Sequence, residues 1–96
     1  MTNKIVFPAT ESMLMHIFRD AEGHVSDTPE NRLLLLDVAN DHEAQLKSDK
    51  YGSYWSARLL ADGRQVWAEV RGGKIVNAGI NETPRNFNRR TGLKKP

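Results

Sequence analysis

The sequence predicts an α+β fold, with two or three N-terminal helices packed on a C-terminal antiparallel β-meander of three to four strands. Two observations predict this class. The first half of the chain carries apolar residues at helical spacing behind a strong helix start, whereas the second half contains two hairpin signals, Asp62-Gly63 and Gly72-Gly73. The 96 residues are enough for one domain with a single modest core.

Two helices are predicted in the first half. The first begins near Thr10 or Ser12, and one of its faces is apolar: Met13, Leu14, Ile17 and Phe18. The second begins at Asp27-Thr28-Pro29-Glu30, where Asp27 or Thr28 caps the helix and Pro29 fits its first turn. This helix continues through a leucine-rich run and ends at Asn40-Asp41. A shorter helical piece is predicted from His42 to Lys47.

The second half is predicted to form strands joined by two-residue turns. Loops of the Asp-Gly and Gly-Gly type suit the turns that connect antiparallel strands. The Gly72-Gly73 turn would pair Val70 with Ile75, and the Asp62-Gly63 turn would pair Leu59 with Val66. Residues 81–87 are expected to add a fourth strand or an extended segment.

This register sorts the strand side chains into two faces, because side chains alternate along a strand. The face expected to join the core contains Trp55, Ala57, Leu59, Val66, Ala68, Val70 and Ile75. The opposite face contains Tyr54, Ser56, Arg58, Gln65, Trp67, Glu69, Arg71 and Lys74. A surface that joins an indole, a carboxylate and several cations predicts a binding site on this second face.

Composition excludes several classes of protein. The chain has no cysteine, so thiol catalysis, disulfides and cysteine-ligated zinc are excluded, and its three histidines lack metal-site spacing. We therefore expect no metal and no cofactor. No apolar run approaches the ~20 residues of a membrane span, and the polar start, residues 1–4, is not expected to be a secretory signal.

The net charge of +2 is unevenly distributed along the chain. Residues 1–84 contain nine Lys/Arg and twelve Asp/Glu, whereas residues 85–96 contain five Arg/Lys and no acid. This basic C-terminal tail is suited to a polyphosphate partner. A solvated extension with no partner is equally consistent with the charge.

Four residues carry candidate chemistry. His24 follows a glycine in the loop between the helices, and an imidazole titrates near neutrality, as acid–base catalysis requires; the alternative is an ordinary surface histidine. Glu69 and Arg71 are two apart on one strand, so a proton acceptor and a phosphate-binding cation share a face, unless they form only a surface ion pair. Trp67 either offers a ring for base stacking or is buried under the C-terminal segment.

Two groups of sequence strings resemble a known family. The first is Gly23-His24 followed by Asp27-Thr28-Pro29-Glu30-Asn31-Arg32. The second runs Asp49-Lys50-Tyr51-Gly52, Gln65-Val66-Trp67, Glu69-Val70-Arg71, Gly73-Lys74-Ile75, Asn77, Gly79, Asn81 and Thr91-Gly92-Leu93. Together they resemble the C-terminal toxin domains of bacterial polymorphic and contact-dependent inhibition systems and of phage-borne toxins, which are similar to the barnase, EndoU, colicin and RelE-like ribonucleases. The resemblance covers nearly the whole chain.

The resemblance implies metal-independent cleavage of RNA, often tRNA, to a 2′,3′-cyclic phosphate, without a cofactor. It implies that His24 acts as acid or base, that Arg71 holds the phosphate and that Glu69 is a second proton carrier. Further substrate contacts are expected from Trp67, Thr83, Tyr54, Arg58, Lys74 and Arg85. It also implies action in the cytoplasm, after delivery from another cell or a phage, and a neutralising immunity protein as partner. Such toxins end longer chains, so we expect either an excised domain or a free-standing gene product.

Three functions are consistent with the sequence. A ribonuclease needs His24 near the face that carries Trp67 and Arg71. A non-catalytic nucleic-acid-binding module would rely on the basic tail and Trp67, and its binding would depend steeply on salt. A protein-interaction or phage accessory domain would use neither. We expect the first.

Overall fold

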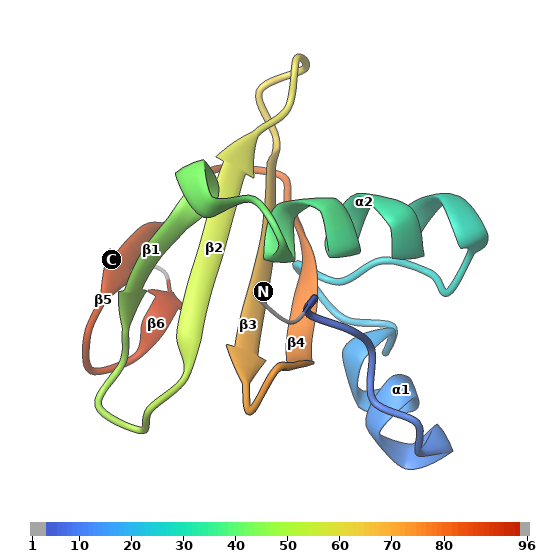
Figure 1. The fold of residues 1–96 in the computed structure, drawn as a ribbon. Coiled ribbons are helices and arrows are strands. Elements are labelled where there is room, and N and C mark those ends of the chain that lie inside the picture. Colours follow the sequence, from blue (N-terminus) through green and yellow to red (C-terminus); the bar gives the residue numbers. More distant parts are fainter. Residues whose placement is uncertain (1–3, 95–96) are drawn as a thin grey trace.

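The computed structural model describes residues 4–94 and has an α+β fold, as predicted. Two α-helices come first, α1 (Glu11–Ile17) and α2 (Pro29–Ala39), followed by a 3-10 turn, η1 (His42–Ala44). The strands are β1 (Gln45–Ser48), β2 (Tyr54–Leu59), β3 (Gln65–Arg71), β4 (Lys74–Asn81), β5 (Asn86–Asn88) and β6 (Gly92–Lys94). Strands β1 to β4 form one antiparallel sheet in chain order, and α2 crosses one of its faces (Figure 1). None of the helices within residues 4–94 is long and apolar enough to cross a membrane.

The start of α2 follows from its capping residues. The Thr28 hydroxyl accepts a hydrogen bond from the Asn31 amide at 3.1 Å, and Pro29 occupies the first turn, where no amide proton is needed. The other helix, α1, is capped by Thr10 without a side-chain hydrogen bond and buries only Ile17 among its seven residues. Its position therefore depends on packing against the sheet.

Replacing Thr28 with Ala is expected to lower the free energy of unfolding by about 1 kcal/mol, because one amide of the first helical turn loses its acceptor. Replacing Thr10 with Ala is the matched control, since the Thr10 side chain makes no capping bond. Urea denaturation followed by tryptophan fluorescence measures both changes. Equal losses in the two variants would contradict a capping role for Thr28.

The main core lies between α2 and the sheet. Its buried residues are Ile17, Leu35, Val38, Ala44, Val66, Ala68, Val70, Ile75, Ala78 and Ile80. The N-terminal segment closes the open side of this layer: the Val6 amide donates to the Gly73 carbonyl and the Ile75 amide to the Val6 carbonyl. The Asn40 side chain bonds both the amide and the carbonyl of Ile5, which ties the same segment to the end of α2.

A second, smaller core lies on the other face of the sheet. Trp55 and Trp67 stack there with ring centroids 5.6 Å apart, and Leu93 and Phe87 pack against them. Gly92 makes this packing possible, because a Cβ at that position would lie 2.1 Å from the Trp55 ring. Residues 86–94, predicted as part of a basic tail, thus form a hairpin that covers the tryptophans.

The predicted register is confirmed at one turn and wrong at the other. At Gly72-Gly73 the pairs Arg71–Lys74 and Val70–Ile75 form as expected, before an irregularity shifts the rest of β4 by one residue. At the first turn Leu59 pairs with Gln65 instead of Val66. The reason is a three-residue loop, closed by the Leu60 amide on the Arg64 carbonyl, with Gly63 at φ 90°.

This slip of one residue turns every side chain of β2 to the opposite face. Trp55 and Ala57, predicted for the core face, lie opposite α2 beside Trp67, and Leu59 is exposed. Three residues predicted for the binding face instead lie on the α2 side: Tyr54, Ser56 and Arg58.

Candidate functional site

The sheet face opposite α2 carries a group of polar side chains beyond the two tryptophans. On β3, Trp67, Glu69 and Arg71 alternate with the core residues and so share this face. Asn77 on β4 pairs with Glu69 and lies beside it. We call the surface formed by His24, Glu69, Arg71, Asn77 and Arg19 the His24 face.

His24 reaches this face because its loop lies directly against β4. The Trp67 indole N–H donates to the Gly23 carbonyl at 3.1 Å, which holds the loop to β3 and β4. Gly79, the cross-strand partner of Trp67, permits this approach: a Cβ there would lie 1.7 Å from the Gly23 oxygen. The loop position thus depends on a glycine in the middle of a strand.

The His24 ring has defined contacts. Its Nδ1 lies 2.8 Å from the Ile17 carbonyl oxygen, and since a carbonyl only accepts, Nδ1 carries the proton of the neutral ring. The ring meets Trp67 edge-on, with centroids 5.7 Å apart. In this tautomer Nε2 has the free electron pair that a general base needs.

Burial lowers the pKa of His24 below its ordinary value near 6.5 and is the largest influence on it. The Ile17 and Ala78 carbonyls favour the protonated ring, while the positive charge of Arg19 and the neighbouring His16 oppose protonation. The net effect is a lower pKa, so the imidazole is neutral at pH 7.

Arg19 is a site residue that the sequence analysis missed. Its Nη1 donates to the His16 carbonyl at 2.6 Å and lies 3.4 Å from the Asn77 side-chain oxygen, so it connects α1 to β4. Among the ion pairs of residues 4–94 none includes Arg19. The signal in the sequence was a cation five residues before His24 at the end of a predicted helix. Arg19 is available to an anion.

Arg71 and Glu69 share one face, as strand alternation predicted, and they form a loose ion pair, which the sequence analysis gave as the alternative to a catalytic role. Arg71 Nη2 lies 3.8 Å from Glu69 Oε2, while Nε and Nη2 donate to the Ser53 hydroxyl at 3.1 and 2.8 Å. The Arg71 side chain remains 54% exposed and the Glu69 side chain 16%. The guanidinium is therefore oriented by Ser53, a buried residue that the sequence analysis did not single out, and still faces solvent.

Glu69 follows Trp67 by two positions, a spacing of about 7 Å along the strand. His24 packs on Trp67 at one end of this part of β3, and Glu69 and Arg71 follow along the strand. Lys74 is exposed beside Arg71 at the end of β3. The structure thus places four of the predicted site residues on one side of the sheet: His24, Glu69, Arg71 and Lys74. Along β3, about 13 Å separates Trp67, which His24 contacts, from Arg71.

Two predicted substrate contacts lie on the other side of the sheet. Arg58 donates to Asp37 and Asp41 and so ties β2 to the end of α2 and to η1. Tyr54 is exposed on the same side. The prediction that Tyr54 and Arg58 share a face with His24 is wrong, because the three-residue first turn points the side chains of β2 to the opposite face.

The other three predicted substrate contacts are Trp67, Arg85 and Thr83. Trp67 is 7% exposed, and its ring contacts Trp55 and His24, so of the two predicted alternatives it is the buried one. We therefore assign to Trp67 the role of holding the loop that carries His24. Arg85 bonds Glu22 at 3.1 Å, next to the Gly23 turn. Thr83 is exposed in the turn after β4.

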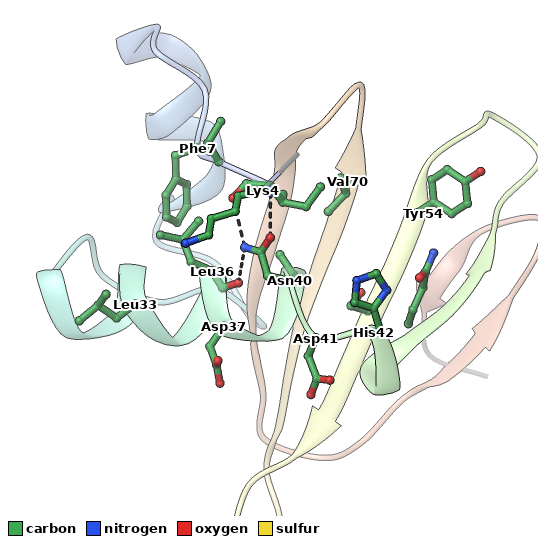
Figure 2. A pocket seen from close by; sticks show the side chains of 15 residues that line it. Lys4, Phe7, Leu33, Leu36, Asp37, Asn40, Asp41, His42, Tyr54 and Val70 are labelled. Atoms are coloured by element: carbon green, nitrogen blue, oxygen red, sulfur yellow. Dashed lines mark hydrogen bonds between the residues drawn. The ribbon is translucent and has the colours of Figure 1, made fainter. Parts of the chain in front are cut away.

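A groove of about 800 Å³ lies on the α2 side of the sheet (Figure 2). Side chains from α2, the N-terminal segment and β2 and β3 line it, among them Phe7, Leu36, Asn40, Tyr54 and Val70. Its carboxylates, Asp37 and Asp41, are paired with Arg58. Because the exposed surface of this groove is mainly apolar and these acids are engaged, we place the chemistry on the polar His24 face.

Asp49 organises the turn that carries Ser53. Its carboxylate accepts from the Trp55 indole at 3.0 Å and from the Tyr51 and Ser53 amides at 2.8 and 3.1 Å. Burial alone would raise the pKa of Asp49, but these three hydrogen bonds and the charge of Arg71 outweigh it and hold the pKa below its ordinary value. The ionised carboxylate therefore connects the tryptophan layer to the Arg71 site.

Within residues 4–94, no three His, Asp or Glu side chains gather in a way that could hold a metal ion. A scan against protein-family models and searches of curated proteins and of solved structures found no match to this chain.

Proposed function

We propose that the protein is a metal-independent endoribonuclease that acts on tRNA or another RNA. The observation that carries the proposal is the His24 face itself. A neutral imidazole with its Nδ1 proton donated to the backbone lies on one sheet face with Glu69, Arg71 and Arg19, and Arg19 takes part in none of the ion pairs of residues 4–94. These are the groups that cleavage through the 2′-hydroxyl requires.

In the proposed reaction, His24 Nε2 takes the proton of a ribose 2′-hydroxyl. The O2′ atom then attacks the adjacent phosphorus, and the bond from phosphorus to O5′ breaks. The products are a 2′,3′-cyclic phosphate and a 5′-hydroxyl. We assign the proton of that hydroxyl to Glu69, which enters the step as the neutral carboxylic acid and leaves it as the carboxylate, while His24 leaves it as the imidazolium.

The cations act on the phosphate. The phosphodiester carries one negative charge, and a second develops on the phosphorane as the deprotonated O2′ attacks. Cations fixed before the reaction stabilise this added charge without reorganising. Arg71 is oriented by Ser53 and half exposed, and Arg19, two residues after the end of α1, lies 3.4 Å from the side-chain oxygen of Asn77. Lys74 adds a third positive charge at the edge of the face. Arg19 is the group that this proposal adds to those implied by the family resemblance.

Purified protein incubated with total tRNA in EDTA is expected to cleave it, and His24→Ala is expected to reduce cleavage by about 10²–10⁴-fold, the usual contribution of a general acid or base. His42→Ala is the matched control, because His42 is exposed at the groove on the α2 side. Mapping of the cleaved ends should show cyclic phosphates. Arg71→Ala and Arg19→Ala test the phosphate contacts without removing a buried group.

The pH profile separates catalysis from a folding defect. Because the pKa of His24 is lowered, the acid limb of kcat/KM is expected below pH 6.5, and it should disappear in residual activity of folded His24→Ala. Equal cleavage by wild type and a folded His24→Ala variant would exclude the proposed base. No cleavage by either would favour the non-catalytic binding module or the accessory domain. The immunity protein and action in the cytoplasm stay predictions of the family resemblance.

A further inference from the structure

Two turns far apart in the sequence meet at one end of the sheet. The turn between β1 and β2 (residues 49–53) and the turn between β5 and β6 (residues 89–91) lie side by side at the lower left of Figure 1. The Lys50 amide donates to the Arg89 carbonyl at 2.7 Å. Trp55 secures both turns, since its indole bonds Asp49 and its ring packs on Gly92. We call this pair of turns the double turn.

The double turn gathers cations. Lys50, Arg89 and Arg90 are exposed, and none of them forms an ion pair with a carboxylate in the described part of the chain. The nearest acid within the turns, Asp49, is buried and already accepts three hydrogen bonds. The positive charge is therefore left for a partner.

An exposed aromatic ring lies among these cations. Tyr51 is 65% exposed, and Lys50 Nζ lies over its ring, 5.0 Å from the centroid. An aromatic ring has two faces, so a cation on one leaves the other for a second planar group. An exposed ring beside backbone-binding cations is how single-stranded nucleic acid is held without sequence preference.

The double turn is continuous with the His24 face through Arg71. Its guanidinium bonds Ser53, the last residue of the first turn, and approaches Glu69 on the other side. A strand of RNA whose scissile phosphate lies at Arg71 would therefore extend over the double turn on one side.

We propose that the double turn is a subsite for single-stranded RNA next to the scissile phosphate. Tyr51 stacks a base, and Lys50, Arg89 and Arg90 bind the neighbouring phosphates. The substrate class rests on the proposed function, but binding at this subsite does not require cleavage. The ring that stacks a base is thus Tyr51, in place of the buried Trp67.

The test uses a fluorescent single-stranded oligoribonucleotide with 2′-O-methyl groups throughout, which binds but cannot form a cyclic phosphate. Its Kd is measured by anisotropy over a range of salt concentrations. Tyr51→Ala is expected to raise Kd about tenfold, while Tyr51→Phe retains the ring and should bind as wild type. Arg89→Ala/Arg90→Ala is expected to lower the salt slope by roughly 1.4, because each phosphate contact to a single strand contributes about 0.7.

Lys4→Ala/Lys47→Ala removes the same charge from exposed cations outside the double turn and should change the slope much less. An equal loss of slope in this control, or a Tyr51→Ala variant that binds as wild type, would overturn the subsite. Cleavage of tRNA is read separately. Binding that depends on Tyr51 without any cleavage would retain the subsite and reject the nuclease, whereas cleavage without Tyr51-dependent binding would do the opposite.

Discussion

Gly79→Ala is expected to lower the free energy of unfolding by about 3 kcal/mol and to abolish RNA cleavage. A Cβ at this position would lie 1.7 Å from the Gly23 carbonyl oxygen and 2.9 Å from His24 Cα, and both are backbone atoms that no rotamer change can move. The loop must then leave β4. It would lose the bond from the Trp67 indole, and His24 would leave the His24 face.

The control for this prediction is Gly63→Ala. Gly63 has φ 90° with nothing within 4 Å of a built Cβ, so Ala costs only the backbone strain of about 1–2 kcal/mol. Gly79 has no positive φ, so its cost comes from contact alone. Urea denaturation with fluorescence of the two tryptophans measures both, and tRNA cleavage is assayed in parallel. A smaller loss at Gly79 than at Gly63, or full cleavage by Gly79→Ala, would show that the loop does not need β4.

Asp49→Ala is expected to cost about 3 kcal/mol at pH 7. The substitution leaves the Trp55 indole and two turn amides without their acceptor in a buried place, and hydrogen bonds to a charged group are the stronger kind. The Ser53 amide would lose its hydrogen bond to Asp49, so Ser53 would no longer hold Arg71 in place and the cleavage rate should fall as well. Asp62→Asn, in an exposed turn, is the control and is expected to change stability much less.

The stabilisation from Asp49 depends on pH in a defined direction. Because its pKa is lower in the folded protein than in the unfolded chain, the unfolded chain binds the proton first as pH falls. The contribution is therefore complete above about pH 4 and is lost as pH falls through the folded pKa. The difference in unfolding free energy between wild type and Asp49→Asn should shrink from pH 7 toward pH 2. A difference independent of pH would show that the ionised carboxylate contributes nothing.

Both predictions concern residues that position the site without touching substrate. Gly79 allows the loop that carries His24 to approach β4 closely. Asp49 stabilises the turn in which Ser53 accepts hydrogen bonds from Arg71. Loss of cleavage in folded variants at these positions would support the two halves of the His24 face independently.

The sequence by itself determined the α+β class, the capped start of α2 and the turn at Gly72-Gly73. These features depend on interactions between residues close in the chain: Thr28 with Asn31, and two glycines with positive φ. The same local logic placed Glu69 and Arg71 on one face, since alternation along a strand holds in any register.

Only the tertiary structure decided which face β2 presents and what covers the tryptophans. The Asp62-Gly63 signal is compatible with loops of two or three residues, and the choice reverses Tyr54 and Arg58. Likewise, charge alone did not show that residues 86–94 fold back as a hairpin, because Gly92 against Trp55 is a contact between distant residues. The approach of His24 and Arg19 to the sheet also depends on contacts between residues distant in the chain. Nothing in the residues next to Gly79 indicates that the Gly23 carbonyl packs against it, and only the folded structure shows this contact.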